Sequence, residues 1–424
     1  MTNTVLALDA MEILDSRGRP TVRATCTLAG GISASASAPS GASTGSAEAL
    51  ELRDGDATRY GGLGCRTAVS HVRRDIHDAL AGRTFAGQAE VDAALCALDG
   101  THNKSRLGAN AILAVSLAFA RAAAQAERRP LYAYFAGLIG RSAHTLPRPT
   151  INLFSGGKHA GVRASMQDIL IVPAAARSMD EALAVTYGVY QAAAALVLRK
   201  YEMRLLRADE GGLAPPFTTP EAILSDAVEA IDAAGYTPGR DVMLAIDVAS
   251  SHFFDGARYQ LGAASLNSAE MIERLVRWSE SYPIVSIEDG LHEDDWSAWP
   301  ELRRRLGDRV LTLGDDFLCT NPVRIVRAIE TGACNALLLK VNQIGTISEA
   351  AQACMLARDA GWRVTVSARS GETEDDWLAD LAVAWGDQIK VGSITQSDRL
   401  AKYNRLLAIE QEMHLPLMRW PNAA

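Results

Sequence analysis

The chain has 424 residues, of which 48% are hydrophobic and 22% charged, which is typical of soluble globular proteins and excludes the disordered and fibrous classes. Its formal net charge of -8 argues against a surface built to bind a phosphate backbone, so we expect no nucleic acid partner. The six cysteines are scattered and form no CxxC pair. They indicate neither a disulfide framework nor a thiolate zinc site, and they favour a reducing, cytoplasmic location.

Two regions with different orders of predicted strands and helices follow one another along the chain. The first predicts short strands over Val5–Ala38 and then helices over Ala68–Leu80, Val91–Leu98 and Ala109–Ala124. After a proline-bearing stretch at Leu146–Thr150, strand-like runs alternate with helical segments, as in the βα units of an α/β barrel. We predict an α+β N-terminal capping domain over residues 1–140 and a barrel over residues 141–424.

The most membrane-like stretch, Ala111–Ala120, is bounded by Asn110 and Arg121. It is shorter than the roughly 20 residues that span a bilayer, so we predict a buried helix and no membrane partner. The first ten residues lack the basic and apolar segments of a secretory signal.

Ionisable residues stand at the ends of the predicted barrel strands. These residues are Asp247, Glu288, Asp315, Lys340, Arg369 and Lys390. Because the carboxyl ends of parallel barrel strands meet at one rim, we expect these side chains to converge there. The alternative for any one of them is a charge that caps a strand end where the chain leaves the core.

Three of these residues, Asp247, Glu288 and Asp315, are carboxylates that would repel one another in a cleft of low dielectric. A divalent cation relieves this repulsion, and a ligand set made only of oxygen favours Mg2+ over Zn2+. Lys340 and Lys390 would face that cation, which lowers the pKa of a lysine toward that of a general base. A salt bridge to a carboxylate remains the alternative for one of the two lysines.

A metal-bound carboxylate opposite a lysine suits removal of a proton from the carbon next to a substrate carboxylate. Loss of a hydroxyl from the next carbon needs an acid, and Glu210 lies in the glycine-flanked sequence Asp-Glu-Gly-Gly. A solvated loop charge is the alternative for Glu210.

Further small-residue loops fit a phosphorylated substrate. The segment Ser40–Gly45 can close over an anion with its backbone N–H groups, and Arg369 with Ser370 presents a guanidinium and a hydroxyl at the rim. A third loop contains His159, which either reaches the substrate or caps a turn.

Several motifs show that the chain resembles the enolase family, the phosphopyruvate hydratases, over nearly its whole length. They are Asp15-Ser-Arg-Gly, Pro39-Ser-Gly-Ala-Ser-Thr-Gly, Leu107-Gly-Ala-Asn-Ala-Ile, Asp209-Glu-Gly-Gly, Ser286-Ile-Glu-Asp, Leu337-Leu-Leu-Lys-Val-Asn-Gln-Ile-Gly and Arg369-Ser-Gly-Glu-Thr-Glu. The resemblance implies a TIM-type (β/α)8 barrel with irregular first units, preceded by the α+β capping domain. It also implies a homo-oligomer, a dimer or an octamer.

The same resemblance implies a role for each matching residue. Asp247, Glu288 and Asp315 are expected to bind Mg2+, and Ser40 to belong to a loop that closes with a second Mg2+. Lys340 is the expected base and Glu210 the group that assists loss of the hydroxyl. Lys390 is expected to bind the substrate carboxylate, and Arg369 with Ser370 the phosphate.

Some positions depart from the family pattern. Ala368 stands where enolases have a histidine, which makes room near the phosphate. Gln167-Asp168 stands where they have Gln-Glu, which shortens a carboxylate expected to help Glu210. Gly290, Ser155 and Ala208 replace a proline, an asparagine and a glycine of the family motifs. These departures leave the metal ligands and the base in place.

Three hypotheses follow. We favour a paralog of specialised metabolism that abstracts the C2 proton of 2-phosphoglycerate or a related phosphorylated or phosphonylated three-carbon acid. An example of such a paralog is the carboxyphosphonoenolpyruvate synthase of phosphonate biosynthesis. The first alternative is an ordinary hydratase that converts 2-phosphoglycerate to phosphoenolpyruvate. The second is a non-catalytic binding protein, which the retained carboxylates and lysines argue against.

Overall fold

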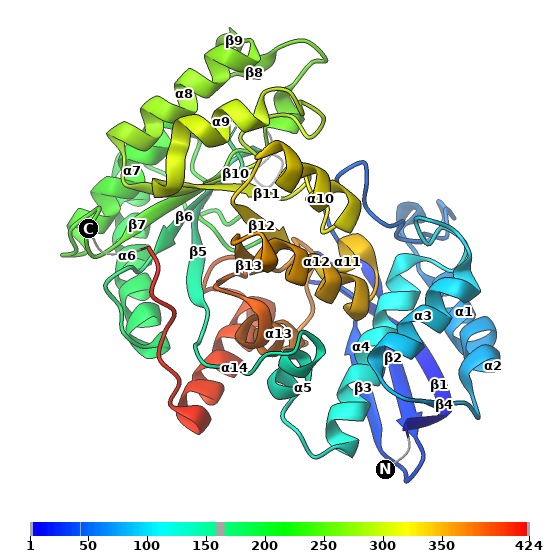
Figure 1. The fold of residues 1–424 in the computed structure, drawn as a ribbon. Helices are drawn as coiled ribbons and strands as arrows, with labels where there is room; N and C mark the ends of the chain where they lie inside the picture. Colours follow the sequence, from blue (N-terminus) through cyan, green and yellow to red (C-terminus); the bar gives the residue numbers. More distant parts are fainter. Residues whose placement is uncertain (1–2, 43, 158–165, 422–424) are drawn as a thin grey trace.

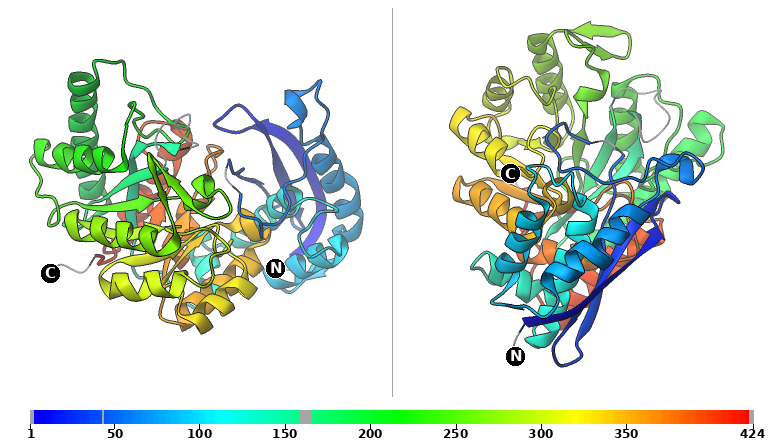
Figure 2. Two further views of the ribbon diagram at one scale, coloured as in Figure 1. Left: turned by 90° about the horizontal axis from the view of Figure 1, so that it is seen from above. Right: turned by 90° about the vertical axis from the view of Figure 1, so that its right-hand side faces the viewer.

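We describe the fold from a computed structural model, which covers residues 3–42, 44–157 and 166–421. An antiparallel sheet with its helices stands beside a closed barrel (Figure 1). Viewed from above in Figure 2, the two lie next to each other, and the blue sheet forms one side of the molecule.

The N-terminal sheet has the strand order β3-β2-β1-β4. Its strands are β1 (Asn3–Leu14), β2 (Pro20–Leu28), β3 (Ser33–Ser37) and β4 (Thr84–Phe85). The helices of this region are α1 (Arg66–His71), α2 (His77–Leu80), α3 (Gln88–Asp99), α4 (Ala109–Ala126) and α5 (Leu131–Leu138), with the short turns η1 (Tyr60–Gly62) and η2 (Val72–Ile76). All strand pairs of this sheet are antiparallel, so the predicted α+β character of this region is confirmed.

Two helices, α4 and α6 (Met179–Tyr201), are long and apolar enough to cross a membrane by composition. Both pack against the protein instead: α4 lies on β2 and β3, and α6 contacts α7 and the first barrel strand. The apolar window of α4 is 89% buried inside the chain. The predicted buried helix is therefore the core helix of the capping domain.

Eight strands close the barrel in the order β5-β6-β7-β10-β11-β12-β13-β14. They are β5 (Arg148–Ser155), β6 (Asp168–Val172), β7 (Met243–Asp247), β10 (Ile284–Glu288), β11 (Leu311–Gly314), β12 (Ala336–Leu339), β13 (Arg363–Ser367) and β14 (Gln388–Lys390). Strand β6 runs antiparallel to both β5 and β7, while the other neighbours are parallel. This reversal confirms a barrel with irregular first units.

The sequence pattern does not predict strand β5, because Pro147 and Pro149 indicate a connection. The strand begins at Arg148, and all of its residues are buried. A proline is tolerated near the start of a strand, where it removes little of the hydrogen-bond ladder.

An outer ring of helices surrounds the barrel (Figure 1). It consists of α6, α7 (Pro220–Ala233), α8 (Ser268–Ser281), α9 (Trp299–Leu306), α10 (Pro322–Thr331), α12 (Ile347–Asp359), α13 (Trp377–Trp385) and α14 (Ser397–Met413). Shorter elements are α11 (Val341–Ile344), η4 (Ser250–Phe253), η5 (Gly307–Arg309) and the hairpin of β8 (Tyr259–Leu261) and β9 (Ala264–Leu266). Side-chain caps fix several helix starts; at α8, Asn267 and Glu270 form a reciprocal capping box.

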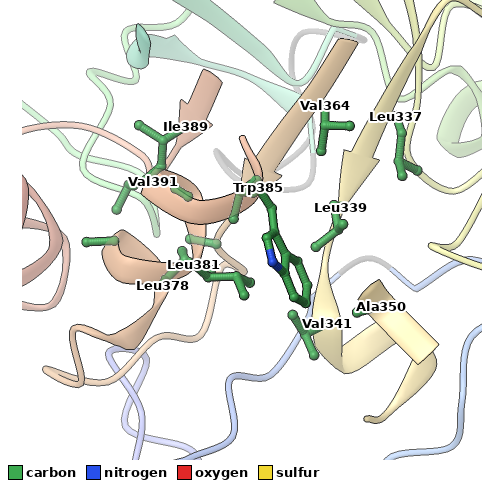
Figure 3. Packing of buried hydrophobic residues seen from close by; sticks show 14 of the residues in the cluster. Leu337, Leu339, Val341, Ala350, Val364, Leu378, Leu381, Trp385, Ile389 and Val391 are labelled. Carbon is green, nitrogen blue, oxygen red and sulfur yellow. The ribbon is translucent and has the colours of Figure 1, made fainter. Parts of the chain in front are cut away.

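The strands separate two apolar layers. One layer packs between strands and helices, and Figure 3 shows Trp385 of α13 in it, beside Leu339 and Val341. The other fills the barrel and is built from Leu170, Val172, Ala245, Val285, Leu311, Leu313, Ala336, Leu338 and Trp420. Because strand side chains alternate, the residues two positions beyond this inner layer point into the barrel mouth.

Candidate active site

The alternation of the strands sets the direction of the rim residues. Asp247 lies two residues after the interior Ala245, and Lys340 lies two after Leu338. On the reversed strand β6, Asp168 lies two residues before the interior Leu170, so it reaches the same mouth from the start of its strand. The barrel core therefore aims these polar side chains at one place.

One pocket at this mouth collects most of the predicted residues. It is lined by Ala42, Gln167, Glu210, Asp247, Ala249, Asp289, Asp315, Asp316, Lys340, Ser367, Ala368, Arg369, Ser370 and Lys390. Glu288 is joined to it through Lys390, and Asp168 is buried beside it. His159 lies outside the described residues.

Lys390 bridges two of the predicted metal ligands. Its Nζ lies 2.9 Å from Asp247 Oδ2 and 2.7 Å from Glu288 Oε2. Burial opposes the lysine charge, but the two carboxylates outweigh it and raise the pKa of Lys390 well above its ordinary value. Burial and the Asp247 carboxylate raise the pKa of Glu288 well above its ordinary value. The salt-bridge alternative considered for one lysine describes both in this structure, since Lys340 also pairs with a carboxylate, that of Asp315.

The third predicted ligand, Asp315, is held by two donors. Lys340 Nζ donates to Asp315 Oδ2, and Gln343 Nε2 donates to Asp315 Oδ1 at 2.9 Å. Burial disfavours the Lys340 charge, but attraction to Asp315 leaves the pKa of Lys340 above its ordinary value. The lowered pKa that we predicted for a base thus depends on a cation that neutralises Asp315.

Two further carboxylates, Asp289 and Asp316, were missed by sequence reasoning. With Asp315 they offer oxygens that all lie within 4.8 Å of one another. However, Asp289 Oδ1 and Oδ2 already accept the backbone N–H groups of Asp315 and Asp316, at 2.9 and 2.8 Å. Asp289 therefore fixes the main chain of Asp315, a predicted metal ligand. The adjacency of Asp289 to Glu288 in the sequence was the signal available for it.

Burial and the neighbouring Asp315 raise the pKa of Asp316 to about 7. This carboxyl group lines the same pocket as Asp289, Asp315 and Arg369. A divalent cation at Asp315 would favour the ionised form of its neighbours.

Glu210, the predicted acid, lines the pocket, and Asp168, which stands where the family has a longer Glu, is buried beside it. Gln167 Nε2 donates to Asp247 Oδ2 at 3.1 Å, which connects this side of the pocket to a predicted metal ligand. Ser155 Oγ donates to Asp168 Oδ1 at 2.6 Å. Two of the departures from the family pattern, Ser155 and Asp168, are thus hydrogen-bonded to each other. Glu210 is 8% exposed, and its main-chain carbonyl accepts the N–H of Ser393.

Arg369 is paired with a residue that sequence reasoning missed, Glu48. Its Nη1 and Nη2 each lie 3.1 Å from one oxygen of the Glu48 carboxylate, and Nη1 also donates to Asn342 Oδ1 at 2.9 Å. Burial disfavours the guanidinium charge, yet Glu48 and the neighbouring acids raise the pKa of Arg369 further above its ordinary value. A charged anion-binding group is therefore present at this rim.

The Ser40 hydroxyl has partners other than the three predicted metal ligands. It donates to Glu51 Oε2 at 3.0 Å and accepts from Arg53 Nη2 at 2.8 Å. Arg17 connects it to Ser370, because Arg17 donates to Ser40 Oγ at 3.2 Å and to Ser370 Oγ at 3.0 Å. The part of Ser40 in a second metal site stays a prediction.

The donor set at the mouth fits a hard divalent cation. Asp247, Glu288 and Asp315 are buried and offer only oxygen, which suits Mg2+. Burial, and then repulsion by Asp247, raises the pKa of Glu288, and such a cation would relieve that repulsion. Asp289 is less available as a ligand, because both its oxygens are used by backbone donors.

Comparisons with known proteins match this architecture. Residues 5–135 match the family model described as "Enolase, N-terminal domain", and residues 143–416 match "Enolase, C-terminal TIM barrel domain". The chain is 46% identical over 419 residues to a curated protein named "Enolase" from Desulfotalea psychrophila (strain LSv54 / DSM 12343). That match covers 97% of this chain and 98% of the relative.

Proposed function

Because the chain belongs to the enolase family, we propose that this enzyme interconverts 2-phosphoglycerate and phosphoenolpyruvate with loss or gain of water. The observation that carries the proposal is the joint lining of one pocket by Lys340, Glu210, Asp315 and Arg369. A base, an acid, a metal ligand and an anion-binding group are the four parts that this reaction needs.

We infer that Asp247, Glu288 and Asp315 hold a Mg2+ ion against the substrate carboxylate, with Ser40 as the candidate for a second one. When bound, the cation supplies positive charge to the dianionic enolate. Lys390 lies beside Asp247 and Glu288, where its ammonium can bind the same carboxylate.

Lys340 is the proposed base. Its Nζ takes the proton from C2, and the electron pair left on carbon spreads into the carboxylate as an enolate. The C3–O bond then breaks as the C2–C3 double bond forms. The departing hydroxide takes a proton from Glu210 and leaves as water, so atoms and charges balance.

Arg369 and Ser370 are the proposed phosphate ligands. Arg369 reaches the pocket with its charge supported by Glu48, and Arg17 orients the Ser370 hydroxyl. A guanidinium suits this task because its planar fork matches phosphate oxygens.

The paralog of specialised metabolism, which we favoured from the residue pattern, is now the second candidate. The high identity to a protein named enolase over nearly both full lengths supports the ordinary hydratase better. One observation keeps the second candidate: Ala368 lines the pocket with a methyl group beside Arg369. That space would accept the bulkier donor of a carboxyphosphonoenolpyruvate synthase.

An assay with 2-phosphoglycerate and Mg2+ separates the candidates. The hydratase predicts robust formation of phosphoenolpyruvate, followed by absorbance, together with exchange of the C2 proton for deuterium. The paralog predicts exchange with little dehydration. A non-catalytic relative predicts neither, and that outcome would refute the proposal.

We also propose that the protein is a homo-oligomer located in the cytoplasm. Strand β1 supports the first point, because it exposes three large apolar side chains, Leu6, Met11 and Leu14, by 52%, 53% and 53%. All six cysteines are free thiols, which fits a reducing compartment. Sedimentation equilibrium tests the assembly, and a monomer at all concentrations would exclude it.

A further inference from the structure

Helix α14 carries two fully buried cations beneath the rim of the barrel. Arg399 and Lys402 are both 0% exposed, and they lie three residues apart on one face of the helix. Burying an ammonium or a guanidinium is costly unless its donors are satisfied. The partners of these two side chains therefore indicate what they do.

Arg399 donates to main-chain carbonyls that follow two neighbouring strands. Its Nη1 lies 2.7 Å from the carbonyl oxygen of Arg369 and 3.0 Å from that of Val391. Its Nη2 lies 2.7 Å from the carbonyl oxygen of Ser370. Arg369 and Ser370 are the proposed phosphate ligands and follow strand β13, whereas Val391 follows strand β14. One guanidinium therefore hydrogen-bonds to the chain at the ends of both strands.

Lys402 closes the same loop one turn later. Its Nζ donates to the carbonyl oxygen of Thr373 at 2.5 Å and pairs with Glu372 Oε2 at 3.1 Å. The other oxygen of Glu372 accepts the backbone N–H of Arg369 at 3.1 Å. The loop from Arg369 to Thr373 is thus fastened to α14 at both of its ends.

Tyr403, on the same face of α14, extends these contacts toward Glu210, the proposed acid. Tyr403 donates its hydroxyl to the carbonyl oxygen of Gly392 at 2.9 Å. Gly392 has a φ of +103°, and a Cβ there would lie 2.8 Å from the carbonyl oxygen of Glu210. A glycine is required at this position, because the Glu210 loop packs directly on it.

We propose that Arg399 is a positioning residue, which sets the main chain of Arg369 and Ser370 so that the guanidinium and the hydroxyl meet a phosphate together. Lys402 supports it through Glu372. This inference rests on the proposed function, which makes Arg369 and Ser370 the phosphate site.

The fork of a guanidinium is what the three carbonyls need. Two nitrogens in one plane can reach the oxygens of Arg369, Ser370 and Val391 at the same time. A lysine at this position keeps the charge but is a single point donor on a flexible stem, so it cannot hold both strand ends.

The test compares Arg399→Lys with a matched change on the same helix, Arg405→Lys, whose wild-type side chain pairs with Asp380 instead of the rim. Inorganic phosphate binding in the presence of Mg2+ is measured by calorimetry, and KM and kcat are measured with 2-phosphoglycerate. We expect Arg399→Lys to lower phosphate affinity and raise KM by about tenfold to 100-fold, since small displacements of binding groups have effects of this size. Mg2+ affinity and the Arg405→Lys variant should stay close to the wild type.

A folded Arg399→Lys protein with unchanged phosphate affinity and KM would overturn the inference. Circular dichroism and Mg2+ binding establish that the variant is folded. If it is not, Lys402→Arg provides the second variant: it keeps the charge, and a loss of phosphate affinity with intact Mg2+ binding is again expected. Wild-type protein that binds phosphate without turning over 2-phosphoglycerate would refute the proposed function alone. Wild-type protein that does not bind phosphate would refute both.

Discussion

Lys390 Nζ lies 2.8 and 2.7 Å from the two carboxylate oxygens of Glu288. This buried pair shows that the acidic mouth of the barrel is only partly neutralised by the protein itself. Glu288 keeps a raised pKa despite the lysine, since burial and Asp247 act in the opposite direction. A divalent cation would complete the neutralisation.

Mg2+ binding is therefore expected to release protons. The pKa of Glu288 is raised above its ordinary value of 4.5, so the carboxyl group retains a proton at pH values where a free one has lost it. The cation needs the carboxylate, so its affinity should rise with pH until the raised pKa is passed and then level off. Calorimetry in two buffers of different ionisation enthalpy measures the proton count. Glu288→Gln should release fewer protons, and a wild type that releases none at any pH where it binds Mg2+ would contradict the prediction.

Replacing the proposed base should separate chemistry from metal binding. Lys340→Ala is expected to reduce exchange of the C2 proton of 2-phosphoglycerate by about 100-fold or more, because a positioned base contributes that much. Mg2+ should still raise the melting temperature, since Asp247, Glu288 and Asp315 remain. Lys200→Ala is the control, as Lys200 pairs with Asp226 away from the pocket. Exchange at the wild-type rate would assign the base elsewhere.

Asp289 should affect the Mg2+ affinity of the site without binding the ion itself. Asp289→Asn keeps a residue that tolerates the observed φ of +44°, but an amide can accept only one of the two backbone N–H groups. We expect Mg2+ affinity to fall about tenfold or more, as for other groups that orient ligands. Asp294→Asn, at a side chain that is 59% exposed, should leave the affinity unchanged. Equal affinities in both variants would show that Asp289 does not position Asp315.

The pocket beside Ala368 can be refilled. Ala368→His should increase turnover of 2-phosphoglycerate, because it restores the polar side chain that the family pattern has there. Ala368→Leu adds volume without a hydrogen-bonding group and should not increase it. The measurement is the rate of phosphoenolpyruvate formation for the three proteins. No difference between the His and Leu variants would mean that this position does not control dehydration.

The core should be sensitive at the contact of Trp385 with the capping region. The Trp385 ring packs at 6.0 Å from Phe135, and its Nε1 donates to the Phe135 carbonyl oxygen at 2.8 Å. Trp385→Ala should lower the free energy of unfolding by about 3–5 kcal/mol, as for other large buried side chains. Trp385→Phe should cost less. Denaturant titration measures both, and a loss under 1 kcal/mol for the alanine variant would contradict the buried packing.

Much of the barrel was predictable because its causes are local. Short apolar runs between helical segments indicated the barrel strands other than β5, and the polar residues two positions after Ala245, Leu313 and Leu338 follow from the alternation of strand side chains. Strand β5 escaped because its prolines resemble a connection. The direction of β6 could not come from periodicity, since a strand has the same pattern in both directions.

The sequence by itself determined which residue types stand at the strand ends, and so that carboxylates, lysines and an arginine would share one rim. Only the tertiary structure decided which of these residues interact. The ion pairs are Lys390 with Glu288 and Arg369 with Glu48, and the hydrogen bonds join Asp289 to the backbone of Asp315 and Arg399 to two strand ends. These partners lie between 8 and 321 residues apart in the chain. Periodicity reports only near neighbours, whereas such pairings depend on how the strands close and how the capping domain lies on the barrel.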